Sequence, residues 1–251
     1  MASPFPTIIE SEHIFLFVDN EGEDFSLYLC TEKFNLIQER DMQKTLNWLY
    51  EHWMKATPFL ALYTFILIWL YVGHDTTQGI ALTLIWLQCP FYWAHEFEEY
   101  VLPGGFLDFF NRHMMRSTRG DKPLTKVGSF WINIPLMYVL LPLSGVLSHY
   151  LGTDWGLWTA YYSTLNASAH VVMFFLFGRK YNPGLVVSIL LNIPLGIYTI
   201  WFFLTNGLVS TGANILSIIV GILAQASMMV YGFAYLVPQS KKEGYHQSVN
   251  K

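Results

Sequence analysis

Six apolar runs divide most of the chain into segments of membrane-spanning length. The runs cover residues 58–72, 79–97, 128–147, 155–177, 184–205 and 212–237. Each is roughly long enough to cross a hydrocarbon core of about 30 Å as an α-helix, although the first is short and is expected to begin inside the preceding helix. The pattern therefore predicts an all-α fold, a polytopic membrane helical bundle with six transmembrane helices.

The residues before the first run are predicted to form an N-terminal extension. Apolar stretches at 13–18 and 25–30 alternate only loosely, so a small hairpin and a disordered arm both fit residues 1–33. From residue 34 to 55, apolar positions alternate with charged ones, which predicts an amphipathic helix along the membrane interface. The predicted organisation is an extension at 1–57, a six-helix transmembrane domain at 58–237 and a tail at 238–251.

Positive charges fall on one side of this arrangement. The loops at 73–78, 148–154 and 206–211 contain no Lys or Arg, so all 14 basic residues belong to the other side. Lys and Arg accumulate on the cytoplasmic side of membrane proteins. The asymmetry therefore predicts an integral, multi-pass membrane protein with both termini cytoplasmic.

Composition narrows the classes of partner. With 53% hydrophobic and 13% charged residues, the chain is far more apolar than a soluble domain of its size. The formal net charge of -4 and the lack of a Lys/Arg-rich block argue against nucleic acid as a partner. The two cysteines, Cys30 and Cys89, lie far apart, so neither a disulfide framework nor a cysteine metal motif is predicted.

The second apolar run ends in a cluster of ionisable residues. His95, Glu96, Glu98 and Glu99 fall within five consecutive positions at its predicted cytoplasmic end. Carboxylates in or beside hydrocarbon are costly unless they meet water, a cation or a metal ion. Since positions i, i+3 and i+4 share one face of a helix, the side chains of His95, Glu98 and Glu99 are expected to converge.

The predicted topology places a second histidine at a similar depth. The fourth run crosses the membrane in the same direction as the second, so His170 is expected within a turn or two of the level of His95. Three asparagines in neighbouring runs are expected in the same inner half, where they can face one polar cavity open to the cytoplasm. These asparagines are Asn133, Asn166 and Asn192.

These side chains match the ligand set of a catalytic metal ion. Three nitrogen and oxygen ligands that leave a position for water are typical of catalytic zinc, and two histidines with one carboxylate also suit non-haem iron. The predicted ligands are His95, His170 and Glu99, with Glu98 as the acid/base. The stretch at 95–99 also starts like the zinc-protease motif H-E-x-x-H, but it has Glu99 where that motif has its second histidine. In a variant of that motif, His95 and Glu99 are the ligands and Glu96 is the base.

A structural interpretation without a metal ion also fits these residues. The two glutamates at 98 and 99 would then pair with Arg112 or Arg116 in the following basic loop. The second histidine, His170, would hydrogen-bond Asn133 or Asn192. Under this interpretation the polar cluster has no catalytic role.

Together these motifs resemble a known family. The H-x-x-E-E sequence at 95–99, the further histidine His170 and the Tyr-x-Pro-Gly sequence at 181–184 resemble the HXXEE-motif family of small integral membrane proteins. The resemblance covers roughly residues 60–237. It implies a helical membrane fold, and the family has no generally assigned reaction.

The Tyr-x-Pro-Gly sequence is also a good helix start. Asn182 is predicted to be the N-cap and Pro183 the first helical residue. Helix-start chemistry does not explain Tyr181, whose hydroxyl is expected to reach the cavity from the inner interface. Tyr181 and the three asparagines of the inner half are therefore predicted to contact substrate or to support the catalytic residues.

The sequence supports three hypotheses for function. The first is a metal-dependent, hydrolase-like membrane enzyme that uses zinc or iron and acts on a lipophilic substrate. The second is a metal-free acid/base isomerase or cyclase of isoprenoid-like substrates, in which Trp93, Phe97 and Tyr181 stabilise developing positive charge. The third is a proton- or cation-coupled transporter, since carboxylates inside the membrane and proline-broken helices also suit that function.

Overall fold

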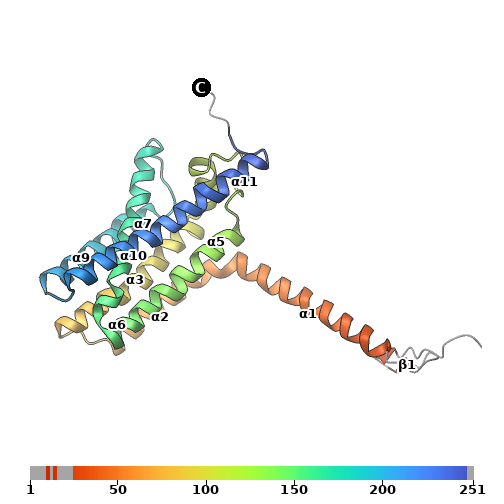
Figure 1. The fold of residues 1–251 in the computed structure, drawn as a ribbon, viewed down its shortest axis with the longest axis horizontal. Helices are drawn as coiled ribbons and strands as arrows, with labels where there is room; N and C mark the ends of the chain where they lie inside the picture. The colour runs from red at the N-terminus through yellow and green to blue at the C-terminus, as the bar shows by residue number, and fades with distance from the viewer. Residues whose placement is uncertain (1–9, 12–13, 16–24, 248–251) are drawn as a thin grey trace, which may run out of the picture. The chain divides into compact units, whose positions relative to one another are not determined.

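The computed structural model is built almost entirely from helices (Figure 1). It describes residues 10–11, 14–15 and 25–247, and the prediction of an all-α fold is confirmed for these residues apart from one pair of two-residue strands. The chain divides into two compact units, Met1–Glu51 and His52–Lys251.

The first unit contains the strand pair and a long helix. Strand β1 (Glu10–Ser11) pairs antiparallel with β2 (Ile14–Phe15), and α1 (Phe25–His52) follows. Residues 25–30 are therefore helical, and the expectation of a hairpin or disordered arm is wrong for them. Their apolar positions continue the three- and four-residue spacing of the helix that follows. Most of the apolar stretch at 13–18 lies outside the described residues.

The helices of the second unit form a bundle (Figure 1). Several α-helices run directly into short π-helical segments, whereas η1 and η4 are single turns of 3-10 helix. The elements are η1 (Trp53–Ala56), α2 (Thr57–Tyr71), α3 (Thr77–Tyr100), α4 (Phe106–Phe109), η2 (Phe110–Met114), α5 (Lys126–Asn133), η3 (Ile134–Leu140), α6 (Leu141–Leu151), η4 (Thr153–Gly156), α7 (Leu157–Leu176), α8 (Leu185–Val187), η5 (Ser188–Asn192), α9 (Ile193–Thr205), α10 (Thr211–Val230), η6 (Tyr231–Leu236) and α11 (Val237–Lys242).

Four continuous helical stretches of the described chain are long and apolar enough to cross a membrane. Their length and composition indicate an integral membrane protein. The stretches are Leu36–Tyr71, Lys126–Leu151, Leu185–Thr205 and Thr211–Lys242. Helices α3 and α7, which cover the other two predicted spans, are not among them. Both carry buried polar and ionisable side chains, which lower their mean hydropathy.

Helix α3 is the central element of the second unit. Apolar side chains in its first half pack against α7 and α9, and those in its second half pack against η3, α6 and α7. Near the end of α3, the hydroxyl groups of Tyr92 and Tyr162 lie 2.8 Å apart in a buried hydrogen bond between α3 and α7. This bond fixes the two helices to each other about one turn from His95.

Close packing of α10 against α7 predicts the effect of one substitution. A Cβ atom at Gly221 of α10 would lie 2.9 Å from Cβ of Tyr161 and 3.0 Å from the backbone nitrogen of Tyr162. Gly221→Ala should therefore force the helices apart and lower the free energy of unfolding by about 1–3 kcal/mol. The matched control Gly212→Ala, also on α10, has no atom within 4 Å of the new Cβ and should not destabilise. Equal thermal unfolding midpoints for the two variants would contradict this prediction.

Candidate metal centre

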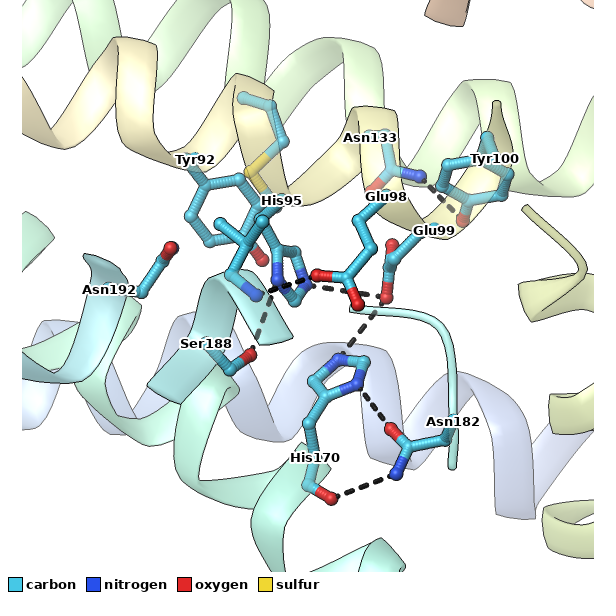
Figure 2. A network of polar contacts seen from close by, with 12 residues as sticks. Tyr92, His95, Glu98, Glu99, Tyr100, Asn133, His170, Asn182, Ser188 and Asn192 are labelled. Carbon is cyan, nitrogen blue, oxygen red and sulfur yellow. Dashed lines mark hydrogen bonds and ion pairs between the residues drawn. The ribbon is translucent and has the colours of Figure 1, made fainter. Parts of the chain in front are cut away.

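Two histidines and one glutamate from α3 and α7 converge on one point (Figure 2). Nε2 of His95 lies 3.4 Å from Oε1 of Glu99, and Nε2 of His170 lies 3.2 Å from the same oxygen. These three atoms all lie within 4.8 Å of one another, and all three residues are buried. His95 and Glu99 are one turn apart on α3, and His170 faces them from α7. The structure thus brings together the three residues predicted to be metal ligands.

Asn182 determines which ring nitrogen of His170 carries a proton. Its side-chain Nδ2 donates to the carbonyl oxygen of His170 at 3.1 Å, so its Oδ1 faces Nδ1 of His170 at 2.7 Å (Figure 2). An amide oxygen only accepts, and Nδ1 must therefore be the donor. A neutral His170 then presents the lone pair of Nε2 to the carboxylate of Glu99. Two acceptors at this distance repel each other unless a proton or a metal cation lies between them.

His95 has a comparable contact on its other ring nitrogen. Its Nδ1 lies 3.3 Å from the hydroxyl oxygen of Ser188, which begins the π-helical segment η5. The rings of His95 and His170 meet edge to face, with centroids 4.7 Å apart. Histidines that bind metals through Nε2 usually give the Nδ1 proton to an oxygen in this way, because that contact fixes the tautomer and the ring orientation.

The distances from the Glu99 oxygen to the two histidine nitrogens fit a single metal ion. Nitrogen and oxygen ligands bind zinc at about 2.0–2.2 Å, so in a tetrahedral site two such atoms lie about 3.4 Å apart. The distances from the glutamate oxygen to the two histidine nitrogens are 3.4 Å and 3.2 Å. His95, Glu99 and His170 therefore have the atom types to hold zinc, and two of their three separations match a tetrahedral site, while all three ligand atoms lie within 4.8 Å of one another. The same set suits non-haem iron.

The loop between α7 and α8 closes over both histidines. Gly184 has a φ of +98°, and a Cβ atom there would lie 2.7 Å from Cε1 of His95 and 2.7 Å from Cε1 of His170. Only glycine combines this backbone conformation with such a close approach. The imidazole rings and the loop therefore pack without space for any side chain at this position.

The predicted role of Asn182 and Pro183 as a helix start is wrong. The helix begins at Leu185 with Gly184 as its N-cap, and no side chain caps it from that position. Asn182 is fully buried, and its amide serves His170 instead. A buried imidazole N–H needs a hydrogen-bond acceptor, and the side-chain oxygen of Asn182 is that acceptor.

Glu98 supplies the missing helix cap. Its Oε1 accepts hydrogen bonds from the Tyr181 hydroxyl at 2.7 Å and from the Val186 amide at 3.0 Å. Its Oε2 accepts from the Val187 amide at 2.7 Å. A carboxylate at this position satisfies free N–H groups and interacts favourably with the helix dipole. Tyr181 thus reaches the site through Glu98, and these contacts favour a positioning role for Glu98, whose predicted acid/base role stays a prediction.

The contacts named in the metal-free structural interpretation are wrong. Arg112 pairs with Asp108 one turn before it, at 2.8 Å, rather than with a glutamate of α3. Oppositely charged side chains at i and i+4 of one helical segment meet locally, and this pair leaves the α3 carboxylates to the buried groups around them.

The three predicted asparagines have separate environments. Asn133 donates to the hydroxyl of Tyr100 at 3.2 Å, and Asn192 donates to the hydroxyl of Ser163 at 3.3 Å, so neither contacts His170. Asn166 is buried, and its Oδ1 has no hydrogen-bond partner among the described residues. Only Asn133 and Asn166 line the cavity described next.

A cavity of about 420 Å³ adjoins the candidate metal centre. Its polar side is formed by Glu96, Glu99, Asn133, Asn166 and His170, and most of its remaining wall is apolar. Its volume falls within the range of about 300–1,000 Å³ typical of small-molecule sites. Glu96 is only 1% exposed, and its Oε2 has no hydrogen-bond partner among the described residues. Glu96 therefore lines the cavity and carries a buried oxygen without a hydrogen-bond partner among the described residues.

A comparison with protein families matches the same region. The model of a family described as a protein of unknown function with an HXXEE motif matches residues 86–199. This region is similar to the HXXEE family. The HXXEE region contains all three converging residues and the whole loop at 181–184, so the family match covers the site. No curated protein and no solved structure matches the chain.

Sequence reasoning missed three residues of the HXXEE site. Asn182 and Gly184 lie in the Tyr-x-Pro-Gly sequence that carries the family resemblance, which was a usable signal. Helix-start chemistry offered a simpler explanation for Asn182, and Gly184 was given no role of its own. Ser188 had no comparable signal, because a serine inside an apolar run is common. Its contact with His95 depends on how the two helices pack.

The close approach at Gly184 of the HXXEE region predicts a second stability difference. Gly207→Ala introduces a side chain at a φ of +63° with no atom within 4 Å, so it should cost about 1–2 kcal/mol from the backbone alone. Gly184→Ala has the same backbone problem and also meets two imidazoles, which should add about 1–3 kcal/mol. Unfolding free energies in detergent measure both. An equal loss in the two variants would show that the histidines do not pack against this loop.

Proposed function

We propose that the protein is a metal-dependent membrane hydrolase. In this proposal His95, Glu99 and His170 hold one zinc or iron ion, and the substrate is a lipophilic ester or amide. The main support is the pair of acceptors, His170 Nε2 and Glu99 Oε1, that face each other at 3.2 Å while the His170 proton is held by Asn182. A bound cation removes this repulsion. It also accounts for the second imidazole directed at the same oxygen.

The chemistry divides between the ion and the protein. A bound divalent metal ion supplies a Lewis acid for a carbonyl oxygen and a water molecule that loses its proton near neutral pH. Glu96, which lines the cavity and has a buried oxygen without a hydrogen-bond partner among the described residues, takes that proton and gives it to the leaving oxygen or nitrogen as the C–O or C–N bond breaks. The water oxygen remains on the carbonyl carbon. The products are a carboxylic acid and an alcohol or an amine.

The acid/base role therefore goes to Glu96 in this proposal, as in the arrangement derived from the zinc-protease motif. Glu98 already accepts three hydrogen bonds that fix the start of α8. We assign it a positioning role, because it connects α3 to the loop that holds His170.

The topology completes the proposal. We propose six spans with both termini cytoplasmic, in which α3 and α7 are the two spans whose polar faces turn into the bundle. Their buried histidines, carboxylates and asparagines support this placement, because polar groups in membrane helices face the protein interior.

A metal-free isomerase or cyclase and a cation-coupled transporter stay predictions, and metal analysis separates them from a hydrolase.

Elemental analysis of the purified full chain tests the metal ion. We expect about one equivalent of zinc or iron, lost in His95→Ala and in His170→Ala. His149→Ala is the matched control, because His149 is an exposed histidine of α6 remote from the three converging atoms. Asn182→Ala should keep the three ligands but weaken metal affinity by about 10–100-fold. Well-folded protein without stoichiometric metal would contradict the proposal.

Turnover of the para-nitroanilide of lauric acid tests the division of roles between two glutamates. Glu96→Gln should keep the metal content and the unfolding midpoint but lower kcat by about 100-fold or more, since an amide cannot carry the proton. Glu98→Gln should lower the unfolding midpoint, because one acceptor oxygen becomes an NH2 group facing a peptide N–H. A loss of kcat in Glu98→Gln without a change in its unfolding midpoint, together with unchanged turnover in Glu96→Gln, would assign the acid/base role to Glu98.

A further inference from the structure

We infer that the cavity beside the candidate metal centre binds a lipid amide, and not an ester or a lipid phosphate. The inference deepens the proposed hydrolase by naming its substrate class. It rests on that function only for the reaction, because the binding argument uses the walls of the cavity alone.

Three buried acceptors point to a ligand that donates a hydrogen bond. Glu96 Oε2, Asn166 Oδ1 and Gln225 Oε1 are each buried without a hydrogen-bond partner among the described residues, and all three residues line the cavity. A buried acceptor left unpaired costs about 1–3 kcal/mol. An N–H group in the cavity would recover part of this cost. A simple ester has no donor to offer, whereas a secondary amide has one.

The position of these acceptors suits an amide that reacts at the metal centre. Asn166 lies one helical turn before His170 on α7, a rise of about 5–6 Å, and Gln225 faces the cavity from α10. A substrate carbonyl near Glu99 and His170 would therefore place its neighbouring N–H within reach of Asn166 or Gln225. Neutral amide side chains also pair with a substrate amide both as donors and as acceptors.

The charged side chains that line the cavity disfavour the binding of a lipid with an anionic head group. No Lys or Arg is among the described residues that line it, whereas two carboxylates, Glu96 and Glu99, are. Proteins bind phosphate through Arg, Lys or clustered backbone N–H groups, because its charge must be compensated. One divalent ion held at the candidate metal centre would only balance the charge of the two carboxylates, so a lipid phosphate would find no net positive charge in this cavity. The walls therefore favour a ligand whose polar group is uncharged.

The apolar wall has room for a hydrocarbon chain and opens toward the bilayer. Leu165, Val172 and Leu176 line the cavity and are also 38%, 53% and 69% exposed. They are spaced i, i+7 and i+11 along α7 and thus share one face. That face is lipid-facing in a membrane, so a chain can enter sideways beside α7.

The interior of the cavity is lined by flexible side chains. Four methionines contribute to its wall, and methionine adapts its shape to apolar ligands because the side chain is unbranched and polarizable. These residues are Met114, Met173, Met228 and Met229. A wall of this kind selects for an apolar chain without requiring one exact length, so the polar group must provide the specificity.

Binding of three matched lipids tests the inference. Tritiated N-ethyl stearamide, ethyl stearate and stearyl phosphate share one chain length and differ in the polar group. Each is titrated against the purified full chain in detergent by scintillation proximity, and the bound label is extracted and identified as intact lipid or product. We expect the amide to bind at least tenfold more tightly than the ester and the phosphate.

Two substitutions identify the groups responsible. Gln225→Met and Asn166→Leu keep the apolar volume but remove the acceptors, and each should weaken amide binding about tenfold without changing ester binding. Ser227→Ala is the matched control, because Ser227 is an exposed residue of α10 that bonds only its own helix. Unfolding midpoints near that of the unaltered chain show that the variants fold.

The outcomes separate this inference from the proposed function. Equal affinities for the three lipids, tighter binding of the phosphate, or unchanged amide binding in Gln225→Met and Asn166→Leu would overturn the inference. Selective amide binding by protein that contains no metal ion would support the inference and contradict the hydrolase. Stoichiometric metal in protein that binds the amide no more tightly than the ester would support the metal centre and contradict the inference.

Discussion

The contact between His170 and Glu99 is the constraint on which the rest of the site depends. The side-chain oxygen of Asn182 accepts a hydrogen bond from Nδ1–H of His170, so the lone pair of Nε2 faces a carboxylate oxygen at 3.2 Å inside a buried cluster. This arrangement is stable only with a positive charge between the two atoms. It also requires the loop that carries Asn182 to lie against both imidazoles, and that close approach leaves glycine as the residue that fits at 184.

The spacing of the HXXEE motif follows from two tasks on one helical face. His95 and Glu99, at i and i+4, both reach the point of convergence with α7. Glu98, at i+3, reaches the neighbouring helix start and accepts two of its peptide N–H groups. The same helix turn therefore supplies two candidate ligands and the cap that holds the loop over them. A change of either carboxylate disturbs a different part of one continuous network.

The sequence was sufficient for features that depend on periodicity, and insufficient for those that depend on packing. The convergence of His95 and Glu99 follows from helical spacing, and the level of His170 follows from the alternation of charged loops. Asn182 was assigned to the wrong partner, because an asparagine before Pro-Gly suits a helix cap and a buried hydrogen bond equally well. Six spans were predicted, and four helical stretches of the described chain are long and apolar enough to be candidate spans. The polar residues that form the site lie in α3 and α7 and make these two helices less apolar than their neighbours.

The π-helical segments around the site interrupt the regular hydrogen bonding of the helices that carry it. Residues of η2 and η6 line the cavity, and η5 contributes Ser188 beside His95. A π-helical turn holds an extra residue and has poorer hydrogen-bond geometry than an α-helical turn, so it survives where a side chain must be shifted to another face. Pro194 lies two residues after the end of η5 and lacks an N–H, which removes a regular helical bond at that point. The gathering of such turns at one cavity indicates that side-chain placement there outweighs the regularity of the helices.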